Sequence, residues 1–177
     1  MAKQPYFPTF EKLTKKDFGG TLLKGNAREP RPISIKRPMH LVLKSSLAKN
    51  ENSFLITKKK RRIEQVIRRA SKANDVKLYR FANNGNHLHL IVLPRSRQSF
   101  AKFIRTISGL IARIALDAER GNAHGKKFWD ARPFTRILDW GRDYRNACAY
   151  VLKNTLEVMG FMSHVRRRQS REFLEPG

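Results

Sequence analysis

Residues 86–94, which read NHLHLIVLP, constrain the fold of this chain more than any other segment. The segment is short and apolar and ends in a proline, a pattern typical of a buried strand. Side chains alternate between the two faces of a strand, so one face receives two histidines and the other receives only aliphatic residues. The two sets are His87, His89 and Ile91 on the first face, and Leu88, Leu90 and Val92 on the second.

The two histidines lie next to each other on their shared face, about 6–7 Å apart at Cα. Their ring nitrogens can therefore converge on one divalent metal ion. The other interpretation is a pair of structural histidines that bond to polar neighbours within the sheet. The spacing alone leaves both interpretations open, because a bare His-x-His is a common accident in sequences.

Residues 141–159 form a second segment with a clear period, and Gly160 follows them as a helix stop. Its apolar residues recur at helical spacing: Tyr144, Ala147, Cys148, Val151, Val158 and Met159. At about 100° per residue, we expect Tyr150 to lie roughly opposite this stripe. Asn154, four residues later, shares the face of Tyr150. Packing alone does not require a ring and an amide there, although an exposed or interfacial tyrosine is common.

Together, the His-hydrophobic-His strand and the later helical Tyr-x-x-x-Asn pattern resemble the HUH single-tyrosine transposases of the smallest insertion sequences. The resemblance is strongest to the REP-associated tyrosine transposases and covers most of residues 38–161. It includes the NHLHLIV strand, the pair Phe128-Trp129 ahead of a short strand, and the AYVLKN stretch of the helix. Two departures concern local geometry: the family often has Met-Pro where this chain has Asn84-Gly85, and Asn-Pro where it has Asn154-Thr155.

In that family two histidines and an amide bind a divalent metal ion, and the tyrosine attacks a DNA phosphate. The resemblance implies that His87, His89 and Asn154 are the metal ligands and that Tyr150 is the nucleophile. It also implies a 5′-phosphotyrosine and a free 3′-OH as products on single-stranded or hairpin DNA. Two imidazoles and an amide, with no thiolate nearby, suit Mg²⁺ or Mn²⁺ better than structural zinc.

The charge of the chain indicates a polyanionic partner independently of these motifs. Its 177 residues carry 38 Lys and Arg against 14 Asp and Glu, a net charge of +24. This excess favours nucleic acid first and an anionic membrane surface second. No apolar run approaches the ~20 residues that a membrane span needs. The single cysteine, Cys148, cannot form an internal disulfide, which fits a reducing cytoplasm.

We expect the DNA contacts to come mainly from basic side chains. Five consecutive cations start a predicted helix, where they oppose the helix dipole, and others precede the first strand or flank the fourth. One aromatic ring, that of Trp129, either stacks on a base or packs in the core. The expected DNA-binding residues are Lys58, Lys59, Lys60, Arg61, Arg62, Arg28, Arg31, Lys36, Arg37, Trp129, Arg132 and Arg136.

Three regions are expected along the chain: a basic N-terminal arm, a catalytic domain and a basic C-terminal tail, at residues 1–37, 38–162 and 163–177. Within the domain the periodicity predicts the order β-α-β-β-α-β-α. This order favours an α+β fold, a ferredoxin-like antiparallel sheet with helices packed on one face. It is also the HUH nuclease fold that the resemblance implies.

Two further expectations concern the strands. Asn83-Asn84-Gly85 predicts a hairpin turn, which makes the histidine strand central and antiparallel to its neighbour. His40, on the first predicted strand, has no metal-ligand spacing and is expected to be structural.

An alternative function is a non-catalytic, basic nucleic-acid-binding module with a ferredoxin-like sheet. It explains the charge and the Phe128-Trp129 pair, but not the combination of two histidines, a tyrosine and an asparagine. An HUH replication-initiation or relaxase nuclease would share the site, but the short length and the absence of a P-loop disfavour it. The sequence does not distinguish a monomer from a homodimer, and it does not identify the target hairpin.

Overall fold

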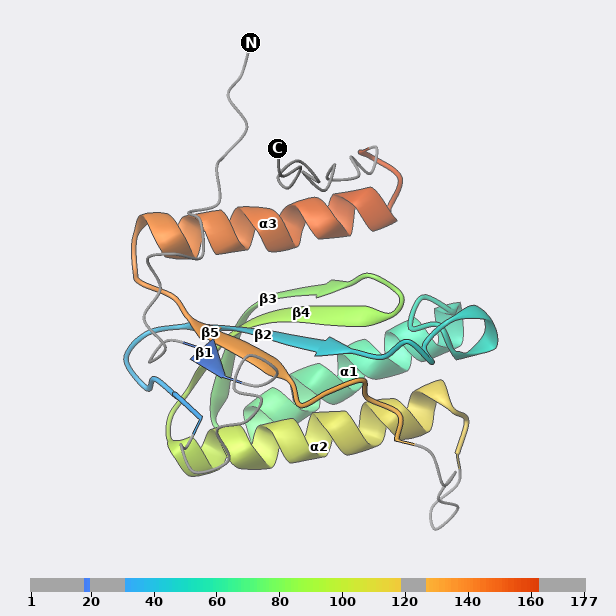
Figure 1. Ribbon diagram of the computed structural model, residues 1–177, viewed down its shortest axis with the longest axis horizontal. Helices are drawn as coiled ribbons and strands as arrows, with labels where there is room; N and C mark the ends of the chain where they lie inside the picture. Colours follow the sequence, from blue (N-terminus) through green and yellow to red (C-terminus); the bar gives the residue numbers. More distant parts are fainter. Residues whose placement is uncertain (1–17, 20–30, 119–126, 163–177) are drawn as a thin grey trace, which may run out of the picture.

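The computed structural model describes residues 18–19, 31–118 and 127–162, which build one antiparallel sheet with three long helices (Figure 1). The strand order is β1-β5-β2-β4-β3, and every neighbouring pair is antiparallel. The strands are β1 (Phe18–Gly19), β2 (Met39–Lys44), β3 (Val76–Asn83), β4 (His87–Pro94) and β5 (Phe134–Ile137). The expected central position of the histidine strand is confirmed, because β4 lies between β2 and β3.

The helices are α1 (Thr57–Ala73), α2 (Arg97–Ala115) and α3 (Arg142–Val158). The α+β class is confirmed, and so is the predicted order of elements from β2 to α3. Strand β1, which pairs with β5 and lies in the expected arm, and the 3₁₀ helix Asn50–Asn52 were not predicted. Helices α1 and α2 cover one face of the sheet, as expected, whereas α3 lies over the opposite face (Figure 1). The expectation that all helices share one face therefore fails for α3. The reason is that β4 buries apolar or histidine side chains on both of its faces, so both faces need a cover.

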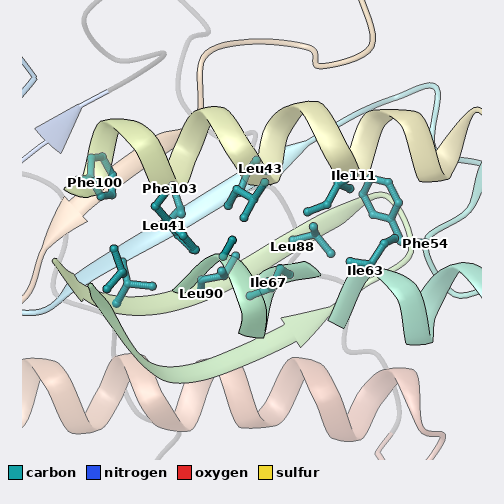
Figure 2. Close-up of a cluster of buried hydrophobic side chains, with 14 of the residues drawn as sticks. Leu41, Leu43, Phe54, Ile63, Ile67, Leu88, Leu90, Phe100, Phe103 and Ile111 are labelled. Carbon is teal, nitrogen blue, oxygen red and sulfur yellow. The ribbon is translucent and has the colours of Figure 1, made fainter. Parts of the chain in front are cut away.

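The main core fills the space between the sheet and α1 with α2 (Figure 2). Leu41 of β2 and Leu90 of β4 are directly paired across the sheet, and both are completely buried. The helices meet them with apolar residues at helical spacing, among them Ile63 and Ile67 from α1, and Phe103 and Ile107 from α2. Each such side chain stabilises the fold by about 1.5–3 kcal/mol when it leaves water.

The turn between β3 and β4 sets the position of the first histidine. Gly85 has φ +87, a left-handed conformation that a side chain rarely adopts, and its amide is bonded to Asn83 Oδ1 at 3.0 Å. Its carbonyl accepts from the backbone N–H of Phe54 at 2.8 Å, and Asn84 N–H donates to the His87 carbonyl at 3.0 Å. The Asn-Gly departure from the family pattern thus forms a closed hairpin that starts β4 at His87.

The segment just ahead of β2 is part of the folded body. Ile33 packs against the main core, and the Trp140 indole donates to the Lys36 carbonyl at 2.9 Å. Arg37 pairs with Asp139 at 2.6 Å. Residues 31–37, which the sequence places in the arm, therefore contact the sheet directly. No helix in the described part of the chain has the length and apolarity to cross a bilayer.

Candidate active site

The second face of the sheet carries a row of histidines. His87 and His89 project from β4 on this face, with ring centroids 4.9 Å apart. On β2, Val42 is directly opposite His89 and Lys44 is opposite His87, so His40 also projects from this face. The His40 and His89 rings are nearly parallel, with centroids 5.2 Å apart, and His40 Nε2 lies 3.1 Å from His89 Nδ1. Three imidazoles are therefore adjacent, not two.

Tyr150 completes this cluster from α3. Its ring meets the edge of His89 at a centroid distance of 5.4 Å and that of His40 at 6.1 Å. The expectation that Tyr150 lies opposite the apolar stripe of its helix is wrong. It lies at the margin of the stripe, because α3 covers a sheet face that is itself polar at the histidines. Its ring is partly buried against the second core cluster, which consists of Ala82, Ile91, Leu138, Ala147 and Val151.

Asn154 lies on the sheet-facing side of α3, one turn beyond Tyr150, and is only 7% exposed. Its Nδ2 is buried and has no hydrogen-bond partner among the described residues, and the same holds for His89 Nε2. Asn84 Oδ1 and Ser108 Oγ are also buried without a partner in the described ranges. A buried polar atom without a partner costs stability, and on the α3 face a bound group could satisfy it.

Helix α3 is held over the sheet by an ion pair at its first turn. Arg136 of β5 donates two hydrogen bonds to the Asp143 carboxylate, at 2.8 and 3.2 Å. The Arg136 side chain is 10% exposed, and the same carboxylate accepts from the Asp139 backbone N–H at 3.1 Å. Arg136 is also the direct cross-strand neighbour of His40. This bidentate pair fixes the approach of α3, and with it Tyr150, to the histidines.

Burial keeps the histidines in their neutral form. Removal from water, with smaller contributions from the neighbouring His40 and His87, lowers the pKa of His89 to about 3. The pKa of His40 falls to about 4 through burial and the charge of Arg136. Burial and Lys44 also lower the pKa of His87. A neutral imidazole has a lone pair to offer, which is the form that binds a metal ion.

The residues of this face fit a divalent ion. His87 Nδ1 lies 2.6 Å from Asn86 Oδ1, so Nδ1 carries the proton and Nε2 keeps its lone pair. His89 Nε2 and the Asn154 amide supply two buried groups without partners in the described structure. No set of three His, Cys, Asp or Glu side chains in the described ranges is arranged to hold a metal.

His40 is the residue of this site that the sequence missed. It was expected to be structural because a lone histidine has no ligand spacing. The alternation of side chains along β2 could have indicated it. His40 shares its face of the strand with Val42 and Lys44, which pair with His89 and His87 of β4. Only the register of the two strands reveals that this face is the one with His87 and His89.

Four of the expected DNA-binding residues are engaged inside the protein. The Lys59 ammonium is buried and donates to the carbonyls of Glu51 and Ala115, at 2.6 and 2.7 Å, and pairs with Asp117. Arg136 is bound to Asp143, as described. The Trp129 indole donates to the Ser108 carbonyl at 3.0 Å and packs against the core, so the packing alternative is correct for it.

Arg31 is the fourth of these residues. Its Nη1 donates to the Pro133 carbonyl at 2.6 Å and to Thr135 Oγ1 at 3.3 Å. Burial and the charge of Arg132 lower its pKa. The guanidinium therefore ties the chain ahead of β2 to β5.

The other expected DNA contacts remain open to solvent where the structure describes them. Arg37 is partly exposed and paired with Asp139. Arg28 lies outside the described residues. The exposed cations are Lys36, Lys58, Lys60, Arg61, Arg62 and Arg132.

Comparison with known proteins identifies the family. The model of the family described as "Transposase IS200 like" matches residues 36–154, more than half of the chain. This chain belongs to the IS200-like transposase family. The match spans β2 through Asn154 and so includes the three histidines, Tyr150 and Asn154.

One solved structure supports the fold of this IS200-like transposase, and a second is similar to the chain. A REP-associated tyrosine transposase bound to a REP hairpin has a TM-score of 0.56 at 17% identity, with 74% of this chain and 73% of that one covered. A candidate transposase from Deinococcus radiodurans R1 has a TM-score of 0.44 at 15% identity, with 72% of this chain and 97% of that one covered. No curated protein matches the sequence.

Proposed function

We propose that this IS200-like transposase cleaves and rejoins single-stranded DNA at hairpin-flanked sites, with Tyr150 as the nucleophile and a divalent metal ion as cofactor. The observation that carries the proposal is the contact between Tyr150 and His89, whose rings meet edge to face at 5.4 Å. A tyrosine from a helix therefore contacts a histidine pair on a strand. A protein that only binds nucleic acid does not require a tyrosine beside two histidines.

In the proposed reaction, Tyr150 attacks a DNA phosphorus atom through its phenolic oxygen. A bond forms between that oxygen and phosphorus, and the bond from phosphorus to the 3′ oxygen breaks. The phenol loses its proton and the departing 3′ oxygen gains one. The products are a 5′-phosphotyrosine and a free 3′-OH. The phosphotyrosine conserves the energy of the phosphodiester, so the strand can be rejoined without ATP.

His87, His89 and Asn154 would hold the metal ion, as Mg²⁺ or Mn²⁺. When bound, the ion polarises the phosphate oxygens and offsets the charge that develops on them. The chain's own residues orient the reacting groups. Arg136 and Asp143 anchor α3, and the partly buried ring of Tyr150 is held between that helix and the histidines.

The proposed DNA substrate is consistent with the charge of +24. The REP-associated transposase of similar fold was bound to a REP hairpin, which supports a hairpin as the partner here. Exposed cations on α1, together with Lys36 and Arg132, are the proposed phosphate contacts. We assign residues 38–162 to catalysis, residues 1–37 to a basic arm whose residues 18–19 and 31–37 contact the sheet, and residues 163–177 to a basic tail.

A covalent-adduct assay tests the proposal. Labelled single-stranded DNA that carries the hairpins flanking the gene is incubated with the protein and Mn²⁺ or Mg²⁺, and a denaturant-resistant protein–DNA band is mapped to a peptide. The wild type should give a band at Tyr150, and Tyr150→Phe should reduce it by more than about 1,000-fold, as expected for loss of a nucleophile.

Tyr144→Phe is the matched control. Tyr144 lies on the same helix and packs against the buried cluster of Ala82, Ile91, Leu138, Ala147 and Val151, and its substitution removes the same single atom. This variant should retain the band. A band that persists in Tyr150→Phe and disappears in Tyr144→Phe would refute the assignment, and no band with any flanking hairpin would favour the binding module.

A further inference from the structure

We infer that His40 is a positioning residue that fixes the tautomer of His89 and so directs the Nε2 lone pair of His89 to the metal ion. The inference rests on the proposed function, because it concerns how a metal ligand is prepared. Ligand histidines usually donate their second ring N–H to a fixed partner, which sets both the tautomer and the orientation of the ring.

The contact between the two rings is a hydrogen bond between nitrogens. His40 Nε2 and His89 Nδ1 are 3.1 Å apart, and the ring planes differ by only 22°. Two neutral imidazoles can form this bond in only one of two ways: His89 donates from Nδ1, or His40 donates from Nε2. The choice decides which nitrogen of His89 carries a proton.

The surroundings of His89 favour the first arrangement. If His40 donated, His89 would be protonated at Nε2, and this N–H would be buried without a partner in the described part of the chain. An unsatisfied buried donor is costly, and a protonated nitrogen cannot bind a metal ion. If His89 donates, Nε2 is instead a bare lone pair, and a metal ion satisfies it.

His87 provides a parallel on the same strand. Its Nδ1 lies 2.6 Å from Asn86 Oδ1, an oxygen that can only accept. Each proposed ligand histidine thus has its own partner at Nδ1: an asparagine for His87 and His40 for His89. The second partner comes from a different strand, and its neighbours on either side, Ile91 and Arg136, are held in the sheet.

The test reads the ring nitrogens directly. Histidine ¹⁵N shifts are recorded on metal-free protein at neutral pH, and Mn²⁺ affinity is then measured by calorimetry without DNA. The wild type should show His89 protonated at Nδ1 with a bare Nε2. His40→Phe keeps a flat ring but removes the acceptor, so the His89 tautomers should mix and Mn²⁺ affinity should fall by about 10–100-fold.

Two variants distinguish positioning from packing. His40→Gln places an acceptor oxygen where Nε2 was, so it should restore the His89 tautomer and most of the affinity. Asn86→Leu should disturb the His87 nitrogens and leave those of His89 unchanged. A backbone ¹H–¹⁵N spectrum shows whether each variant is folded.

The inference is overturned if wild-type His89 carries its proton on Nε2, or if His40→Phe leaves both the His89 shifts and Mn²⁺ affinity unchanged. It is also overturned if His40→Gln behaves like His40→Phe while both remain folded. None of these readouts uses cleavage. A wild type that fails to cleave DNA would refute the proposed function alone, so the two failures are distinguishable.

Discussion

The two faces of the central strands β2 and β4 have opposite characters. On the face toward α1 and α2, Leu41 and Leu90 are completely buried among aliphatic and aromatic side chains (Figure 2). On the face toward α3, the same strands present His40 and His89 next to Tyr150. One residue of shift along the strand changes a side chain from one environment to the other.

This difference indicates that the face toward α1 and α2 stabilises the fold, whereas the face toward α3 carries the proposed catalytic residues. On the α1 and α2 face the buried side chains of the strands are apolar and pack against one another. The α3 face leaves His89 Nε2 and Asn154 Nδ2 buried without partners among the described residues. Such groups reduce stability and persist in natural proteins mainly at functional sites. Adjacent substitutions on β4 should therefore have separable effects.

The largest effect is expected at His89. His89→Ala should reduce cleavage and adduct formation by more than about 1,000-fold, as expected when a group that acts in the transition state is lost. Hairpin binding should change little, because affinity comes mainly from phosphate contacts. Cleavage is measured on a labelled hairpin and binding by titration under the same conditions. Equal cleavage with and without divalent ions would show that the metal assignment is wrong.

Substitution of Leu90, which follows His89 on β4 and faces the apolar core, should affect stability and not cleavage. Leu90→Ala should lower the free energy of unfolding by about 2–5 kcal/mol, through lost burial and the cavity that remains. Its side chain is completely buried opposite Leu41. Denaturant unfolding measures the loss, and cleavage per folded molecule should stay near the wild-type value. A variant that was fully stable but inactive would contradict the separation of the two faces.

Much of this arrangement could be predicted from the sequence. The alternation in residues 86–94, the Asn-Gly turn and the helical period of residues 141–159 are local signals, and each element formed where it was expected. The family pattern then identified His87, His89, Tyr150 and Asn154. These four residues lie on two elements, and the resemblance to the family, not the periodicity of either element, joined them in one expected site.

What could not be predicted depends on which faces meet. Whether α3 lies above or below the sheet is a tertiary choice, and it determines that Tyr150 reaches His89 from the margin of its helix's apolar stripe. His40 has no local pattern and acquires its role from strand register alone. Charge was also an incomplete guide, because a cation in a basic run can be internal. Lys59 binds the last carbonyl of α2, and Arg136 binds Asp143.

The polar face should also make stability sensitive to acid. Burial lowers the pKa of His40 to about 4 and that of His89 to about 3, below the ordinary value of 6.5. The unfolded chain therefore binds more protons than the folded one below pH 6.5, so stability falls as the pH is lowered through this window. We expect a loss of about 1–2 kcal/mol per histidine between pH 7 and pH 5. Thermal or denaturant unfolding in EDTA measures it.

His40→Phe is the control for this pH dependence. It removes one of the two imidazoles whose pKa is lowered most, so the slope of stability against pH should become shallower in this variant. Leu90→Ala should lower stability equally at both pH values and leave the slope unchanged. A wild-type protein that is equally stable at pH 7 and pH 5 would argue against two buried neutral histidines.

The smallest expected effect concerns Lys60, and it tests whether the α1 and α2 side of the protein contacts DNA. Lys60 is exposed on α1, and Lys59 beside it is buried against the end of α2. If Lys60 contacts a phosphate, Lys60→Gln should reduce the slope of log affinity against log salt by about 0.7–0.9 and leave stability unchanged. Lys59→Gln should do the reverse, with a stability loss of about 1–3 kcal/mol from the broken buried contacts. Binding is measured over a salt series on one hairpin. An unchanged slope in Lys60→Gln would confine the DNA to other parts of the chain and leave this side with a structural role alone.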